Sequence, residues 1–307
     1  MLYYIAMNQI EDMQTFVRIV NAGSITKAAE QMNTVKSAVS RRLAHLERRL
    51  GVTLLTRTTR SQSLTDSGKS YYQQSLRIID DVEELESSIQ NENCALVGRI
   101  KLAAPLSFGL IHLAPALRAF NKIQPEIHFD LDFNDRKVDI VDEGFDLAIR
   151  ITQLQDSSLI ARKISQTQLV LSASPDYLKS HAKISQINDF QNGHVKLNYK
   201  NSPDTWNFKN TENKLVQVNI PSVLEANNGE YLCQAALAGM GLIYTPDFII
   251  YKYIRLKQLL PILADKLKPE KLNIYAIYPQ NRHLSKRVRF LIDFLSEYFG
   301  DVPYWQI

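Results

Sequence analysis

The sequence predicts an α/β protein that begins with a small helical domain. Two observations lead to this fold class. Apolar residues recur at helical spacing through most of the first 50 residues, and from about residue 99 short apolar strands alternate with helical segments, which is the order found in α/β folds. With 307 residues, of which 45% are hydrophobic, the chain is long enough for two or three domains.

Three helices are predicted before residue 52. The first ends at Gly23, and Ser24 is placed to cap a second, short helix, since serine is a preferred N-cap residue. The third runs from about Lys36 to Leu50 and stops at Gly51, because glycine readily takes the left-handed conformation that ends helices. Two short helices, a tight turn and a third helix are the order of a helix-turn-helix.

The third helix has one apolar face and one basic end. Its apolar residues predict a face that packs on the other two helices: Val39, Leu43, Leu46 and Leu50. Basic and hydroxyl residues lie on or beside its outward N-terminal end: Lys36, Ser37, Ser40, Arg41 and Arg42. In a helix-turn-helix this end enters the major groove of DNA, where such side chains reach phosphates and guanine edges.

Positive charge is concentrated in this part of the chain. Residues 24–60 contain eight basic and two acidic residues, whereas the whole chain carries a formal net charge of only +4. Such a block indicates a polyanionic partner, and a solvated helix face is the ordinary alternative for a charge run. Residues 52–65 then predict two short strands around a basic tip, a wing that places Arg57 and Arg60 for contact with the DNA backbone or minor groove.

These features together resemble the LysR family of transcriptional regulators, whose pattern begins near Met7. The resemblance is carried by FVRIVNAGSITKAAEQM, KSAVSRRLAHLERRLGV and LLTRTTRSQSLTDSG, which follow the family's winged helix-turn-helix in order and spacing. It implies a sequence-specific regulator that binds double-stranded DNA. The residues expected to contact DNA are Lys27, Thr34, Lys36, Ser37, Ser40, Arg41, Arg42, Arg57 and Arg60.

One position departs from the family pattern. Members usually carry a small hydroxyl residue where Val35 stands, at the cap of the recognition helix, and here Thr34 comes one place earlier. Either the helix starts one residue sooner with Thr34 as its cap, or the cap is weaker, at a cost of about 1 kcal/mol.

A long helix is predicted from Asp66 to about residue 91, and it carries two apolar strips. The first strip is Tyr71, Ser75, Ile78, Val82, Leu85 and Ile89; the second is Tyr72, Leu76 and Ile79. Two strips on one extended helix indicate a partner helix, and the alternative is a single helix packed on its own domain. The resemblance implies that this helix is the dimer linker of a homodimer or homotetramer.

The remaining two-thirds predict two Rossmann-like α/β subdomains, with parallel sheets covered on both sides. Single helices are expected from Pro105 to Lys122 and at RKVDIVDEG. Stretches such as GRIKLAAPLSFG and NNGEYLCQAALAGMGLIYTPDF resemble the LysR effector domain, which is similar to periplasmic solute-binding proteins. The expected domains are the winged helix-turn-helix (1–65), the linker helix (66–91), a hinge (92–98), effector subdomain I (99–165 and 268–307) and effector subdomain II (166–267).

An effector site is expected between the two subdomains, because ligands of such folds bind beyond the carboxyl ends of the strands. Its predicted residues are Ser107, Phe108, Arg150, Asn228 and Thr245. Two helix starts, at Ser107 and Asn228, facing one cleft would favour a small organic anion such as a carboxylate. The alternative interpretation is that both residues are only helix caps.

Other classes of site have little support in the sequence. The six histidines lack metal-ligand spacing, and residues 239–241 (GMG) lack the remainder of a dinucleotide-binding motif. Cys94 and Cys233 are interpreted as inert thiols, so neither a cofactor nor a metal is expected. Without a signal peptide or a membrane-spanning run, a non-enzymatic cytoplasmic regulator is predicted. The alternative function is a solute-binding or enzymatic α/β protein whose N-terminal helices only dimerise.

Overall fold

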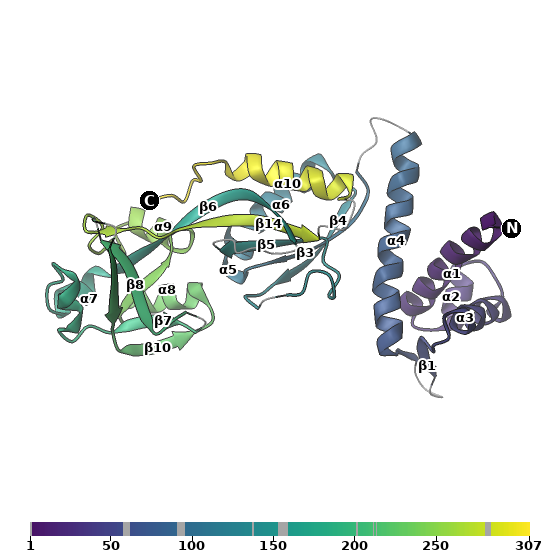
Figure 1. The fold of residues 1–307 in the computed structure, drawn as a ribbon, viewed down its shortest axis with the longest axis horizontal. Coiled ribbons are helices and arrows are strands. Elements are labelled where there is room, and N and C mark those ends of the chain that lie inside the picture. The colour runs from purple at the N-terminus through teal and green to yellow at the C-terminus, as the bar shows by residue number, and fades with distance from the viewer. Residues whose placement is uncertain are drawn as a thin grey trace. The chain divides into compact units, whose positions relative to one another are not determined.

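The computed structural model describes residues 2–57, 62–90, 96–136, 138–152, 159–200, 202–210, 212, 214–279 and 284–307. The chain divides into two compact units, Met1–Arg99 and Ile100–Ile307, each described here by itself (Figure 1). Within the described ranges, no helix has the length and apolar character needed to cross a membrane.

The first unit is a winged helix-turn-helix followed by a long helix. Its elements are α1 (Leu2–Ala22), α2 (Ile25–Gln31), α3 (Lys36–Leu50), β1 (Leu55–Arg57), β2 (Gln62–Leu64) and α4 (Asp66–Gln90). The antiparallel pair β1–β2 confirms the predicted wing strands. Gly23 and Gly51 both have positive φ where α1 and α3 end, and the Ser24 side chain caps α2 by accepting from the Lys27 N–H, as predicted.

The apolar face predicted for α3 forms the core of this unit. Val39, Leu43 and Leu46 are buried against Phe16 of α1 and Ala28 of α2, and Leu50 is half-buried. A small residue such as Ala28 allows close approach of the helices, which brings the three helices around one compact core.

The start of α4 is fixed against the wing. The Thr65 hydroxyl donates to the Thr53 carbonyl and accepts from the Gly68 N–H at 2.9 Å, so Thr65 caps the helix. A Cβ at Gly68 would lie 2.0 Å from the Leu54 carbonyl oxygen, and only glycine fits at this crossing. Farther along α4, Ile78 is 40% exposed although it is apolar. The side chains of residues 83–90, which include Leu85 and Ile89, lie outside the described set.

The second unit is an α/β structure with long strands that run through both of its halves. Following the predicted division, residues 100–165 and 268–307 are called half I, and residues 166–267 half II. The strands are β3 (Gly98–Ala104), β4 (Ile127–Phe133), β5 (Leu147–Thr152), β6 (Leu159–Ala173), β7 (Lys196–Tyr199), β8 (Thr205–Asn210), β9 (Leu215–Asn219), β10 (Ser222–Ala226), β11 (Leu242–Pro246), β12 (Leu260–Pro261), β13 (Leu267–Lys268) and β14 (Lys271–Pro279). The helical segments are α5 (Leu106–Phe108), η1 (Gly109–Leu113), α6 (Ala114–Ile123), α7 (Pro175–Ser180), η2 (Ile187–Gln191), α8 (Gly229–Leu237), α9 (Asp247–Arg255) and α10 (Lys286–Phe299).

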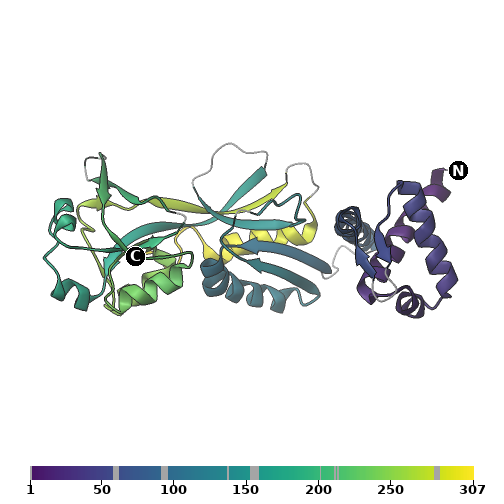
Figure 2. The same cartoon turned by 90° about the horizontal axis from the view of Figure 1, so that it is seen from below.

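The main sheet has the order β10-β7-β11-β6-β14-β5-β3-β4, and it is mixed. Parallel pairing is found for β3–β5, β10–β7 and β11–β7. Antiparallel pairing is found for β11–β6, β14–β6 and β14–β5, where the chain crosses between the halves. The prediction of parallel sheets is therefore wrong for the centre of the unit. The reason is that β14 returns between β6 and β5 from far along the chain, as Figure 2 shows for the long strands shared by the two halves.

Two predicted helices of half I differ in the structure. The helix expected from Pro105 to Lys122 is continuous in position, but it contains the π-helical segment η1. The helix expected at RKVDIVDEG is a set of turns around residues 140–144. There the Asp139 carboxylate accepts from the N–H groups of Val141 and Asp142, and Gly144, with φ +76°, ends the segment after one turn.

Candidate DNA interface and effector cavity

The N-terminal end of α3 presents part of the predicted DNA-contacting set to solvent. Lys36, Ser37 and Arg41 are exposed, and Ser40 is half-buried. Neither Lys36 nor Arg41 forms an ion pair with a residue that the structure describes, and the Arg41 Nε donates only to the Ser37 carbonyl at 3.4 Å. Their charges are thus available for an anionic partner.

The start of α3 settles the question raised by Val35. Val35 is the N-cap residue, it makes no side-chain cap hydrogen bond, and it is 64% exposed. Of the two alternatives that the sequence left open, the weaker cap is the one found: α3 begins at Lys36, and the N–H of Thr34 donates to the Ala29 carbonyl at the end of α2. The recognition helix therefore begins with a weak cap.

A second group of basic residues on α3 faces the acids of α1. Arg42 donates to the Glu11 carboxylate at 2.8 Å and to the Thr15 hydroxyl at 3.3 Å. Arg49 donates to Asp12 at 3.3 Å, and His45 Nδ1 lies 3.7 Å from the same carboxylate, which is buried. Arg42, predicted to contact DNA, is thus already paired with an acidic side chain of α1, although both side chains reach solvent.

The remaining predicted DNA contacts are placed only in part. Lys27 is exposed in the first turn of α2. The main chain of Arg57 ends β1, but its side chain is not among those described, and Arg60 lies outside the described residues.

The second unit contains a cavity of about 540 Å³ lined by residues of both halves. Of the predicted effector residues, Ser107, Phe108, Arg150 and Thr245 line it, whereas Asn228 does not and its neighbour Gly229 does. The structure therefore brings four of the five predicted residues to one cavity.

Both helix N-termini at this cavity already have partners within the protein. The Leu106 N–H, at the start of α5, donates to the Asp135 carboxylate at 3.0 Å. The Asn228 side chain accepts from the Tyr231 N–H at 2.8 Å and so caps α8. Because a carboxylate or amide oxygen already occupies each position, the two helix dipoles attract an anion less than the sequence suggested.

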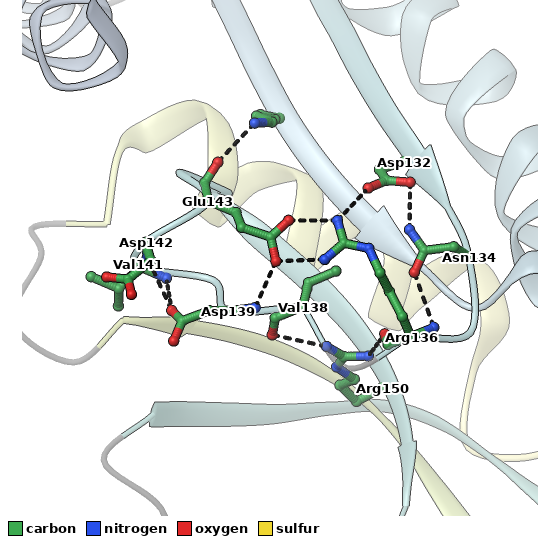
Figure 3. Close-up of polar contacts among 10 residues, drawn as sticks. Asp132, Asn134, Arg136, Val138, Asp139, Val141, Asp142, Glu143 and Arg150 are labelled. Carbon is green, nitrogen blue, oxygen red and sulfur yellow. Dashed lines mark hydrogen bonds and ion pairs between the residues drawn. The ribbon is translucent and has the colours of Figure 1, made fainter. Parts of the chain in front are cut away.

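Arg150 lies within β5, and a loop of half I holds its guanidinium. It donates to the main-chain carbonyls of Arg136 and Val138 at 3.1 and 3.2 Å (Figure 3). Burial, with a smaller effect of the Arg136 charge, lowers the pKa of Arg150, but a guanidinium stays protonated in proteins. With five N–H donors, Arg150 keeps donors for a ligand.

The loop that holds Arg150 is itself braced by ion pairs. Figure 3 shows Arg136 between Asp132 and Glu143, with Nη–carboxylate distances of 3.2 Å to Asp132 and of 2.6 and 2.5 Å to Glu143. The hydrogen bonds from Arg136 lower the pKa of Glu143 to about 2. The Lys101 ammonium also donates to the Glu143 carbonyl, so the loop is tied to β3. This bracing gives the cavity wall a defined position.

Several cavity residues were not predicted. Asp135 follows β4 and accepts a hydrogen bond from Tyr199; burial and this carboxylate together raise the pKa of Tyr199. Asn198 is buried, and its Oδ1 has no hydrogen-bond partner in the described part of the chain. Trp206 and Tyr244 add aromatic surface. Asp135 could have been found, because it is the second residue after β4, and polar residues that follow a strand lie at the sheet edge where ligands bind.

The C-terminal segment packs behind the cavity. Trp305 is fully buried, donates from Nε1 to the Gln166 carbonyl of β6, and contacts the ring of Phe108. His112 of η1 is buried. Its Nδ1 lies 2.6 Å from the Tyr304 hydroxyl, and its Nε2 lies 3.0 Å from the Phe248 carbonyl of α9. Residues 304–305 therefore connect helices of both halves with the crossing strand.

Comparisons with known proteins agree along the whole chain. The family model described as bacterial regulatory helix-turn-helix protein, lysR family, matches residues 10–69, and the LysR substrate binding domain matches residues 95–300. The chain is 36% identical to an uncharacterized HTH-type transcriptional regulator of Haemophilus influenzae, over 92% of this chain and 98% of that protein. Among solved structures it is similar to CrgA of Neisseria meningitidis (31% identity, TM-score 0.61, covering 95% and 99% of the two chains). It is also similar to the virulence activator AphB of Vibrio cholerae (26% identity, TM-score 0.59, covering 94% and 98%).

Proposed function

Because this chain belongs to the LysR family of DNA-binding transcriptional regulators, we propose that the exposed end of α3 and the wing form its DNA interface. The observation that carries this proposal is the exposed pair Lys36 and Arg41, which lack ion-pair partners among the described residues. Ser37 and Ser40 stand on the same end of the helix and can hold phosphates.

A selection of genomic fragments bound by the full chain tests the interface. The expected result is a recurrent, partly palindromic sequence, because a dimer presents two recognition helices. Lys36→Ala should change which sequences are selected, since Lys36 is at the end of the helix that reaches base edges. The proposal is contradicted if wild type enriches no motif, or if Lys36→Ala selects the same motif with the same strength.

The effector proposed for the cavity is a small organic carboxylate that also donates hydrogen bonds. Among the described residues that line the cavity, Arg150 is the one with a cationic side chain, and it supports a carboxylate. Asp135 and the unpartnered Asn198 Oδ1 are acceptors on the wall, and they support a ligand with a donor group such as an amine or a hydroxyl. A bare anion would meet the carboxylates of Asp135 and Glu270 and would offer neither of them a donor.

The effector would regulate DNA binding because it binds one arrangement of the two halves more tightly than the other. An effector that contacts Arg150 in half I and Asn198 in half II favours the setting of the halves in which both contacts form. Such a ligand can shift DNA binding only by its difference in affinity between the two settings.

A further inference from the structure

Two adjacent acids of α1 divide the basic residues of α3 into two sets. Glu11 pairs with Arg42, and Asp12 pairs with Arg49 and lies beside His45. Lys36 and Arg41 have no such partners in the described residues. The positive charge that α3 can offer to DNA is therefore smaller than its number of basic residues suggests, because two of them are paired with acids of α1.

The two acids have different surroundings. Asp12 is 4% exposed and belongs to the interior of the unit, where its pair with Arg49 is structural. The Glu11 and Arg42 side chains are 48% and 38% exposed, so both reach solvent. A pair this exposed contributes little to stability and is easily exchanged.

Arg42 also shares a surface with the DNA-facing residues. It lines an open groove between α1 and α3 together with Arg41, Thr34, Thr15 and His45. A phosphate that approaches Arg41 along this groove would come within reach of the Arg42 guanidinium and of the Glu11 carboxylate beside it.

We infer that Glu11 competes with DNA phosphate for Arg42 and so lowers the affinity of the protein for DNA. In free protein Glu11 and Thr15 hold the guanidinium. On DNA, a phosphate would have to share the Arg42 guanidinium with the Glu11 carboxylate, which neutralises the charge of Arg42 and repels that phosphate. Because every duplex presents phosphates, the effect is independent of sequence.

The matched variants are Glu11→Gln and Glu30→Gln in the full-length chain. Each removes one negative charge from the first unit, but Glu30, exposed on α2, forms no ion pair with a described residue. Only Glu11→Gln releases Arg42. The probe is a fluorescent duplex of random sequence, about three helical turns long, with anisotropy measured at several salt concentrations.

Glu11→Gln should tighten binding several-fold more than Glu30→Gln, and its slope of log K against log salt should steepen by about 0.9, the value for one added phosphate contact. In an Arg42→Gln background, Glu11→Gln should give no more than the Glu30→Gln effect. Equal gains from the two variants, or weaker binding by Glu11→Gln, would overturn the inference. Failure of wild type to bind the duplex would instead refute the DNA interface itself. Melting curves of each variant confirm that it is folded.

Discussion

Arg150 is the residue on which the proposed effector class depends. Its guanidinium is held by two main-chain carbonyls at the cavity wall, so it presents a fixed charge to a ligand. Arg150→Gln should abolish binding of a carboxylate effector and leave DNA binding in the absence of effector unchanged. The reason is that the proposed DNA interface lies in the other unit.

A thermal-shift screen measures this effect. The probes are small organic carboxylates and their uncharged amides; a carboxylate at 100 times its Kd stabilises the folded state by about 2.7 kcal/mol. Thr245→Val changes the cavity lining without removing charge, so it should keep the preference for carboxylates over amides even if it binds both more weakly. The proposal fails if amides stabilise wild type as well as carboxylates do, or if Arg150→Gln responds like wild type.

At the scale of single residues, most of the residues that the sequence predicted for the effector site line the cavity, but the contacts that each side chain makes were not predicted. Ser107 and Arg150 reach the cavity as predicted. Ser107 follows β3 and Arg150 lies in the second half of β5, and the carboxyl ends of these two parallel strands lie at the same edge of the sheet. Asn228 caps α8 instead of lining the cavity. Glu11 could not be connected to Arg42 from the sequence, since the two residues are 31 positions apart and meet only when α1 and α3 pack together.

At the scale of one element, the long helix α4 carries both packed and exposed apolar residues. Part of its apolar surface is used within the first unit, where Tyr71 packs on Phe16 and the Tyr72 hydroxyl bonds to Asn21. Ile78 keeps 40% of its surface exposed. An exposed isoleucine on a helix whose nearer residues are packed is consistent with the proposed dimer contact along α4.

Ile78→Asp should therefore weaken self-association. A charge placed in an apolar helix pair has no partner and opposes its burial. Sedimentation velocity at several protein concentrations should show a smaller species, and Ser70→Asp, on an exposed position of the same helix, should not. An unchanged oligomer for Ile78→Asp would show that α4 does not associate through this residue.

Helices and strands were predicted correctly where residues close together in the sequence determine them. The periodic apolar residues, Ser24 and Gly51 were enough for α2 and α3, and alternating residues found β3 and β4. The mixed sheet was missed because pairing of β14 with both β5 and β6 depends on contacts over 100 residues apart in the chain. Local patterns carry no information on such pairing.

At the scale of the whole second unit, two buried groups respond to pH in opposite directions. Burial raises the pKa of Asp247 to about 6 and lowers the pKa of His112 to about 4. Between these values the folded state binds more protons than the unfolded state at Asp247 and fewer at His112. Stability from Asp247 therefore falls as pH rises from 4 to 6, stability from His112 rises, and the two slopes offset each other.

Asp247→Asn should reveal the pH dependence of stability that comes from His112, because it removes the opposing contribution of Asp247. The amide keeps an acceptor for the Thr167 hydroxyl but does not titrate. Relative to wild type, the free energy of unfolding of the variant should increase by roughly 1 kcal/mol per pH unit across this range. Urea unfolding can be followed by tryptophan fluorescence, because both tryptophans, Trp206 and Trp305, belong to the second unit. Asp265→Asn, an exposed control, should parallel wild type; a parallel profile for Asp247→Asn would contradict the prediction.

The place of β14 and Trp305 has a consequence for how the protein is made. The first unit is one continuous stretch, so all of its partners have been synthesised by the time residue 99 has left the ribosome. The second unit lacks the strand between β5 and β6 until residues 271–279 emerge, and it lacks the side chain that fills its interior behind Phe108 until Trp305 emerges. During translation, therefore, the first unit can fold before the second is complete. Until β14 is made, β5 and β6 each have one unpaired edge, the edge that later pairs with β14, and such edges invite aggregation and chaperone binding.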